Sequence, residues 1–213
     1  GNSEITAAGD FDFTGGILSP DLFRSEGTST VSGAAPKRFV NEWINAGDLT
    51  LTGGTLDIAA FSRFTNEGTF TLAASDPAST VTGPGTFVNQ VDATVTKASD
   101  GTVNFSPGLI EQRGVFTVER GTLALDTASV TTGRYALAEG TELVFTSGTH
   151  RLDTAVPVTT DSEGDVRVTG GTVEFLRGGS QIPEAVDLYL EGGRLGGGGT
   201  LEVRRGFFWS GGE

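Results

Sequence analysis

The sequence predicts an all-β protein, a right-handed parallel β-helix (β-solenoid) with roughly 23 residues per coil. Three observations predict this fold. Glycine supplies 33 of the 213 residues and only 36% of the chain is hydrophobic, which is typical of many short strands joined by tight turns. A three-residue motif recurs at a nearly constant spacing. A short stretch of alternating apolar and polar residues follows each copy of the motif.

The recurring motif ends in a carboxamide residue. Its four copies are Trp43-Ile44-Asn45, Phe64-Thr65-Asn66, Phe87-Val88-Asn89 and Ile110-Glu111-Gln112. The third residues stand at positions 45, 66, 89 and 112, so the steps between them are 21, 23 and 23 residues. A repeat of this length predicts a stack of similar structural units.

A second repeated feature is a pair of short strands around a glycine corner. Residues 48–58 match residues 165–175 at every apolar and glycine position, and fainter copies lie at 115–125 and 187–195. Stacking the copies about 4.8 Å apart pairs the backbone groups of each coil with the next and merges the apolar faces into one core. We therefore expect a rod of about nine coils, on the order of 40 Å long.

The carboxamide residues of the motif are predicted to form a structural ladder, in which stacked side-chain amides hydrogen-bond to one another. These residues are Asn45, Asn66, Asn89 and Gln112. The alternative is that asparagine stands there because it tolerates the left-handed conformation of a turn. The first residues of the motif are predicted to form a core stack, and they are Trp43, Phe64, Phe87 and Ile110.

Four stretches rich in turn-forming residues are expected to leave the coils as loops. They are residues 19–27, 73–77, 153–164 and 177–184. Because loops on a rigid scaffold carry much of protein function, binding is expected there.

Charge and composition narrow the possible partners. The formal net charge of −13 repels phosphate backbones and anionic membrane surfaces, so nucleic acid is not an expected partner. The sequence has no hydrophobic span of about 18 residues, so no membrane insertion of this segment is expected. The chain has no cysteine and one histidine, His150, which excludes the usual zinc ligand sets. No local signature of a Ser-His-Asp triad surrounds that histidine.

One acidic turn offers a weak metal signal. Asp161, Glu163 and Asp165 are spaced at i, i+2 and i+4, an oxygen cluster that a calcium ion could use. The twelve-residue loop pattern of a dedicated calcium site is missing, and a solvated acidic turn is the alternative. No other cofactor is expected.

Several coils resemble those of large bacterial surface and secreted proteins. The residues that carry the resemblance are Phe64-Thr65-Asn66-Glu67-Gly68-Thr69-Phe70-Thr71-Leu72, Arg120-Gly121-Thr122-Leu123-Ala124-Leu125 and Gly199-Thr200-Leu201-Glu202-Val203. They are similar to the degenerate F-x-N-x-G-T-hydrophobic coils of filamentous-haemagglutinin-like and autotransporter-passenger-like β-helices, over about residues 39–209. The resemblance implies an adhesin, stalk or matrix component outside the bacterial cell.

We therefore expect a non-catalytic structural or adhesive segment, extracellular or on the cell surface. Residues 1–213 form one solenoid unit, and the lack of methionine and of a signal sequence suggests a piece of a larger protein. The resemblance implies host or matrix glycans or surface proteins as partners. Exposed coil edges at the two ends would permit end-to-end self-association.

Two other functions remain open from the sequence. A polysaccharide lyase, hydrolase or epimerase would need carboxylates and basic residues converging on one face of adjacent coils. The nearest candidates for such a site are Arg151, Asp153, Arg167 and Glu174. A carbohydrate-binding module without turnover is the other possibility.

Overall fold

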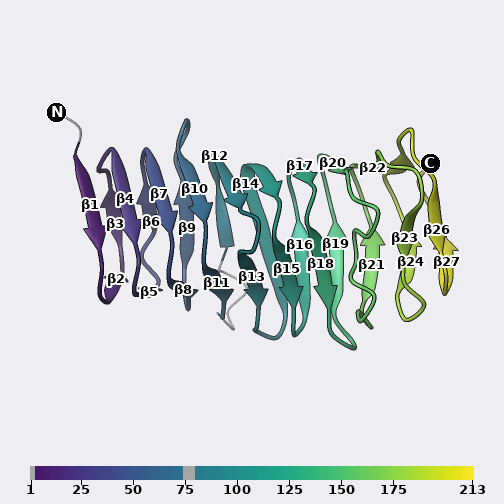
Figure 1. The fold of residues 1–213 in the computed structure, drawn as a ribbon, viewed down its shortest axis with the longest axis horizontal. Helices are drawn as coiled ribbons and strands as arrows, with labels where there is room; N and C mark the ends of the chain where they lie inside the picture. Colours follow the sequence, from purple (N-terminus) through teal and green to yellow (C-terminus); the bar gives the residue numbers. More distant parts are fainter. Residues whose placement is uncertain (1–2, 74–79) are drawn as a thin grey trace.

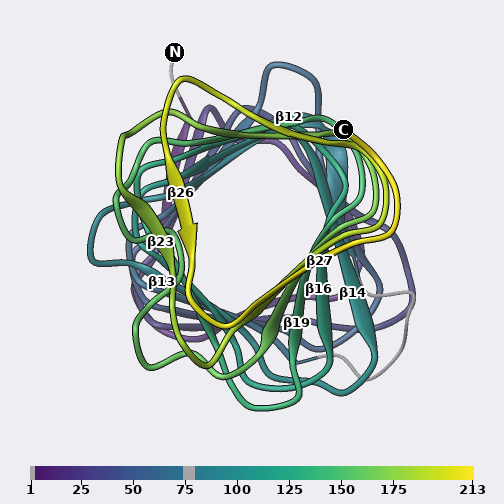
Figure 2. The same ribbon diagram turned by 90° about the vertical axis from the view of Figure 1, so that its right-hand side faces the viewer.

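Parallel strands stack into a β-solenoid in the computed structural model, which describes residues 3–73 and 80–213 (Figure 1). The stack has about ten coils of roughly 21 residues, and the residues described contain no helix. Viewed along the long axis, successive coils superimpose as one ring (Figure 2). The predicted all-β solenoid is therefore confirmed.

The strands fall into three faces that run the length of the stack. The first face contains β1 (Glu4–Ala7), β4 (Leu22–Ser25), β7 (Glu42–Asn45), β10 (Arg63–Asn66), the second halves of β12 (Thr80–Asn89) and β14 (Thr102–Gln112), β17 (Ser129–Thr131), β20 (Thr149–Leu152), β22 (Thr172–Phe175) and β25 (Arg194–Gly196). The third face contains β3 (Gly16–Leu18), β6 (Lys37–Phe39), β9 (Thr55–Ile58), the first halves of β12 and β14, β16 (Thr122–Leu125), β19 (Glu142–Phe145), β21 (Asp165–Val168), β24 (Asp187–Leu190) and β27 (Gly206–Trp209).

The second face lies between these two along the chain. It contains β2 (Phe11–Phe13), β5 (Thr28–Val31), β8 (Asp48–Leu51), β11 (Thr69–Leu72), β13 (Thr94–Lys97), β15 (Val115–Val118) and β18 (Arg134–Leu137). This sheet ends at β18, and in the next coil only Val158 continues it, through an isolated bridge to Tyr135. Strand β23 (Ser180–Ile182) then pairs with β26 (Leu201–Val203).

Coil length varies because the segments between paired strands differ in length from coil to coil. Phe23 pairs with Trp43, which pairs with Phe64 in turn, giving steps of 20 and 21 residues. The steps from Phe64 to Phe87 and from Phe87 to Ile110 are 23 residues. The predicted period of 23 thus reflects the two longest of these coils, and the number of coils is about ten rather than nine.

The internal match between residues 48–58 and 165–175 does not mark equivalent places in the fold. Residues 48–58 run from the second face to the third, whereas residues 165–175 run from the third face to the first. The shared element is the corner, in which Gly54 and Gly171 take φ values of +69° and +67°. A corner that needs a left-handed residue can join either pair of faces. The sequence similarity therefore indicates the same type of turn and does not indicate the same position in the coil.

Two predicted loops contain strands. Residues 22–25 form β4, and residues 180–182 form β23, because neighbouring coils supply partners that short segments between turn residues lack alone. Residues 153–164 contain no strand. The predicted loop at 73–77 extends into residues 74–79, which lie outside the described part of the chain.

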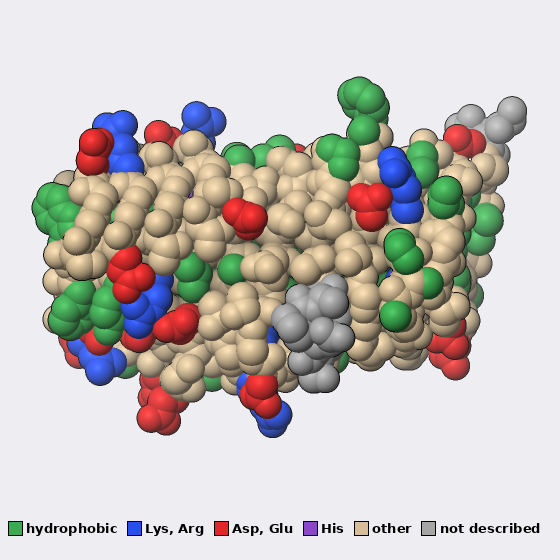
Figure 3. Space-filling model, turned by 180° about the vertical axis from the view of Figure 1, so that it is seen from behind, with side chains coloured by type: hydrophobic (Ala, Val, Ile, Leu, Met, Phe, Trp, Pro, Cys, Tyr) green, Lys and Arg blue, Asp and Glu red, His purple; other side chains and the backbone are tan. Residues whose placement is uncertain are grey.

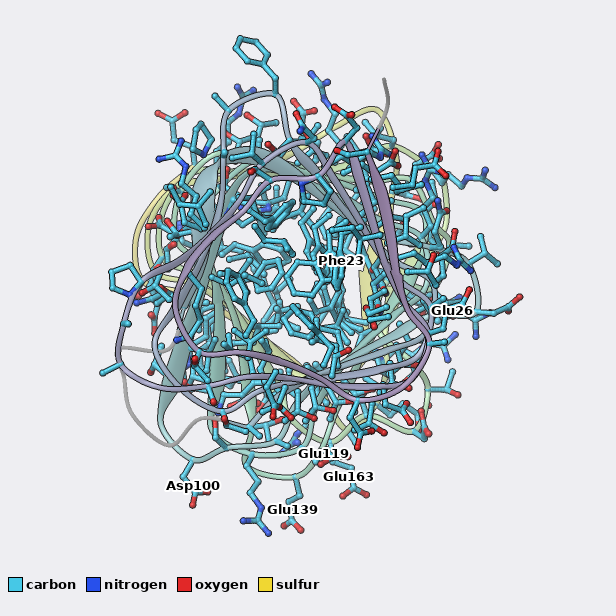
Figure 4. The ribbon with its side chains drawn as sticks, turned by 90° about the vertical axis from the view of Figure 1, so that its left-hand side faces the viewer. Phe23, Glu26, Asp100, Glu119, Glu139 and Glu163 are labelled. Carbon is cyan, nitrogen blue, oxygen red and sulfur yellow. The ribbon has the colours of Figure 1, made fainter. Side chains whose placement is uncertain are left out.

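Inward-facing side chains fill the ring as columns along the axis. Trp43, Phe64, Phe87 and Ile110, the predicted core stack, are each fully buried. Ring centroids are 5.3 Å apart both between Trp43 and Phe64 and between Phe64 and Phe87. Figure 4 shows Phe23 inside the ring, while Glu26 and Glu119 point away from it. The core is therefore a continuous stack, with no layer that separates one coil from the next.

Truncating a ring in the middle of this stack tests its continuity. Phe87 contacts Phe64, Phe105 and Phe116, with centroid distances of 5.3, 4.8 and 6.2 Å. We expect Phe87→Ala to lower the free energy of unfolding by about 3 to 5 kcal/mol, because it removes a buried ring and leaves a cavity. Chemical denaturation measures the change. Val91→Ala, at a side chain that is 65% exposed, is the control and should shift it by less than about 0.5 kcal/mol. Equal effects of the two substitutions would contradict a continuous packed core.

Candidate functional site

The four predicted ladder amides form one hydrogen-bonded column inside the corner between the first and second faces. Nδ2 of Asn45 donates to Oδ1 of Asn66 at 2.8 Å, and Nδ2 of Asn66 donates to Oδ1 of Asn89 at 2.9 Å. Nδ2 of Asn89 in turn donates to Oε1 of Gln112 at 2.9 Å. All four side chains are fully buried.

Each amide also bonds the strand that opens the following face. Asn45 donates to the carbonyl of Thr69 at 2.9 Å, and Asn66 donates to that of Thr94 at 3.0 Å. The ladder therefore adds side-chain hydrogen bonds between successive coils at this corner, where backbone bonds, such as that from the Gln90 amide to the Asn66 carbonyl at 2.9 Å, also join them. Among the non-glycine residues that the structure describes, positive φ values occur only at Asn41, Phe61 and Asp92. A left-handed turn is accordingly not what places asparagine at these four positions.

The column continues beyond the motif with hydroxyl residues that were not predicted from the sequence. Ser25 Oγ donates to Oδ1 of Asn45 at 3.2 Å and accepts from the indole nitrogen of Trp43 at 3.1 Å. At the other end the hydroxyls of Thr131 and Tyr135 lie 3.1 Å apart, and burial raises the pKa of Tyr135 to about 12. The signal that could have found Ser25 and Thr131 is their register, since they pair with Asn45 and Gln112.

The only two lysines of the chain are buried inside the corner between the second and third faces, which the sequence did not indicate. The ammonium group of Lys37 donates to the carbonyls of Gly33 and Gly53, and that of Lys97 donates to the carbonyls of Ser99 and Arg120. Burial lowers the pKa of both amines. Each lysine thus supplies donors to carbonyl groups of two successive corners.

His150 belongs to the core and not to an exposed site. It is fully buried on β20, in register with Ser129, and its ring lies 4.6 Å from that of Phe145. Nε2 donates to the carbonyl of Ser147 at 2.8 Å, and Nδ1 accepts from Ser129 Oγ at 2.9 Å. Burial lowers the pKa of His150 to about 4, so the imidazole is neutral at physiological pH.

The residues of the predicted calcium turn do not converge. Glu163 points outward at the corner together with Glu119 and Glu139 (Figure 4). Asp161 is exposed, whereas Asp165 lies on β21 next to Arg167. Within residues 3–73 and 80–213, no group of three or more histidine or acidic side chains is arranged to hold a metal ion. The calcium site therefore stays a prediction from sequence spacing alone.

The four residues considered for polysaccharide chemistry lie at three separate places on the rod. Arg151 pairs with Glu174 at 3.2 Å on the first face. Asp153 pairs with Arg177 at 2.7 Å in the irregular stretch before the second face. Arg167 lies on the third face. The structure thus brings together only Arg151 and Glu174, and these neutralise each other.

The third face carries an outward cluster of charged and aromatic side chains around Arg167. Arg167 Nε lies 2.7 Å from Glu142, Arg167 Nη1 lies 2.6 Å from Glu191, and the guanidinium carbon stands 4.0 Å above the ring of Tyr189. The Tyr189 ring in turn stacks on Phe208 at 4.8 Å. Toward the C-terminal end, hydrophobic and charged side chains of both signs gather on the surface (Figure 3).

Two carboxylates of this cluster are close neighbours. Asp165 and Asp187 precede Val166 and Leu188, which are paired in the ladder, so the carboxylates stand at the same register on adjacent strands. Burial, and then the negative charge of Asp187, raise the pKa of Asp165. A pair of neighbouring carboxyl groups is the minimum that acid–base chemistry on a glycosidic bond requires.

Comparison with known proteins adds no relative. No protein family, no curated protein and no solved structure matches this chain. In the described part of the chain, no helix is both long and apolar enough to cross a membrane.

Replacing a central ladder amide tests the contribution of the column. Asn66→Leu keeps the size of the side chain and removes donors to Asn89, Thr94 and Gly68. We expect a loss of about 2 to 4 kcal/mol in the free energy of unfolding, because buried polar partners are left unsatisfied. The matched control is Asn104→Leu, at an exposed position of β14, which should have little effect. A loss no larger than that of the control would show that the amides fill space only.

The buried histidine predicts a defined pH dependence of stability. The pKa of His150 is about 6.5 in the unfolded chain and about 4 in the folded chain. Between these two pH values, the histidine binds a proton in the unfolded chain but not in the folded chain. Stability from neutral His150 is thus fully present above about pH 6.5 and falls by about 3 kcal/mol as the pH drops to about 4. Denaturation of wild type and His150→Gln, whose amide can serve the same partners, isolates this contribution from that of the carboxylates. Parallel stability profiles for the two proteins would contradict the prediction.

Proposed function

We propose that this chain is a non-catalytic structural or adhesive rod segment of a large bacterial cell-surface or secreted protein. One observation carries the proposal: the first face is an unbroken parallel ladder of ten strands from β1 to β25. Each coil is hydrogen-bonded to its neighbours through the backbone, so the coils keep fixed positions along one axis.

The interior reinforces that axis. The amide ladder and the ring stack run through the same coils, so separating two coils exposes apolar rings and leaves buried amides without partners at the same time. Such coupling favours a spacer that keeps its length. At about 4.8 Å per coil, ten coils extend for about 45 Å.

The location and partners in the proposal come from sequence and charge. The F-x-N-x-G-T coils resemble those of secreted bacterial β-helices, which supports a place outside the cell. A net charge of −13 disfavours nucleic acid and anionic membranes as partners and leaves glycans or proteins as ligands.

Surface labelling tests the location. Antibodies raised against the purified chain are expected to label intact cells of the producing organism. Labelling that appears only after the cells are permeabilised would overturn an extracellular location. Cells in which the gene has been deleted are the control.

A second candidate is a polysaccharide-active enzyme, and the specific observation that favours it is the Asp165–Asp187 pair with its raised Asp165 pKa. The assay incubates the purified chain with acidic polysaccharides and measures new reducing ends and ultraviolet-absorbing unsaturated ends. The rod proposal expects neither product. Product formation that disappears in Asp165→Asn would establish the enzyme instead, and retention of glycans on an array without turnover would favour a carbohydrate-binding module.

A further inference from the structure

Phe61 is the most exposed large hydrophobic side chain of the described residues and occupies an energetically unfavourable backbone conformation. Its relative exposure is 105% and its φ is +64°. It lies in the corner between β9 and β10, in a turn closed by a hydrogen bond from the Ser62 amide to the Ala59 carbonyl at 3.1 Å. A bulky residue with φ in this region is an outlier, because its Cβ crowds the backbone.

The chain itself shows what such a turn prefers at this position. The turn closed by the Thr141 amide and the Ala138 carbonyl has Gly140 at the equivalent place, with φ of +71°. The turn closed by Ala93 and Gln90 has Asp92 there, with φ of +68°. Glycine and aspartate adopt this conformation readily. Phenylalanine at the third such turn therefore gains nothing within the folded chain, because its side chain is wholly in solvent.

A groove that suits a ring lies on the adjoining first face. It has a volume of about 300 Å³, and its apolar surface comes from Leu109 on β14 and Val130 on β17. Its other sides are Glu111, Arg113 and Thr132. Val130 is 41% exposed, although it lies in the middle of the stack.

The carboxylate beside the groove is already paired with two guanidinium groups. The carboxylate of Glu111 lies 2.7 Å from Arg113 and 3.1 Å from Arg63. An apolar guest therefore meets no unpaired charge at Glu111, and the guanidinium of Arg113 can stack on an aromatic ring. The groove fits a phenyl group better than an ion.

Knob and groove stand on the same side of the rod, a short distance apart along its axis. The register runs from Thr65 on β10 through Val88 on β12 and Glu111 on β14 to Val130 on β17. These strands follow one another along the stack (Figure 1). The groove between β14 and β17 is thus two to three strands from the Phe61 turn, or about 12 Å.

We propose that two copies of this chain pair side by side and antiparallel, with Phe61 of each copy inserted into the Leu109–Val130 groove of the other. A two-fold axis across the rod, midway between knob and groove, brings both contacts together at once. The interface is then closed, and each copy contributes one buried ring. This pairing goes beyond the rod function and does not depend on where the rod is located.

Analytical ultracentrifugation of the purified chain over a range of concentrations tests the proposal. We expect a monomer–dimer equilibrium that strengthens when salt is raised above about 0.15 M, because two chains of charge −13 repel each other. Phe61→Gly should weaken dimerisation at least about tenfold while leaving the melting temperature of the monomer unchanged or higher, because glycine suits the turn. A monomeric wild type, larger open assemblies, or an undiminished dimer of Phe61→Gly would each overturn the proposal.

A second variant and a mixing experiment test the groove directly. Val130→Glu places a charge on the exposed floor of the groove and should also abolish the dimer. The control is Val91→Glu, at an exposed valine in a turn, which should not affect the dimer. Mixing Phe61→Gly with Val130→Glu should restore part of the association, because the intact knob of one variant meets the intact groove of the other. Failure of the mixture to associate more than either variant alone would show that Phe61 does not enter the groove.

Discussion

Parallel pairing in fixed register is the constraint on which the rest of this structure depends. Because each strand bonds the equivalent strand of the next coil, every position along a coil becomes a column of neighbours about 4.8 Å apart. The side chains of each inward-facing column must therefore be able to pack against similar side chains directly above and below them. Phe64 meets Phe87, and Asn66 meets Asn89, at the same register. An aromatic ring or an amide satisfies this condition, since rings stack and an amide carries both donor and acceptor.

The corners obey a different rule, because they are local. Their length changes from coil to coil, and the same glycine-bearing corner joins different faces at Gly54 and Gly171. At two of the corners, buried side chains add to the backbone bonds between coils: carboxamides do so at one corner, and the ammonium groups of Lys37 and Lys97 do so at another. A buried lysine without a carboxylate partner is tolerated because several carbonyl dipoles face it.

Outward positions carry no such constraint, so departures from the ordinary pattern there are informative. Seven of the twelve arginines form ion pairs with carboxylates of neighbouring or next-neighbouring coils, as Arg63 does with Glu111 across two coils. Exposed pairs of this kind add little stability individually. A fully exposed ring on a left-handed residue, as at Phe61, destabilises the folded chain and is the feature that folding by itself does not account for.

The sequence by itself determined the solenoid, the core columns and the amide ladder, because alternation and a repeated motif are properties of consecutive residues that stacking then repeats. The prediction from sequence overestimated the coil length, assigned β4 and β23 to loops, and treated as equivalent two corners that join different pairs of faces. It also gave no sign of the roles of Lys37, Lys97 and Ser25. Tertiary structure decided these points, because strand pairing and the burial of an isolated polar side chain depend on which coil lies alongside. That choice is made by contacts between residues about 20 positions apart.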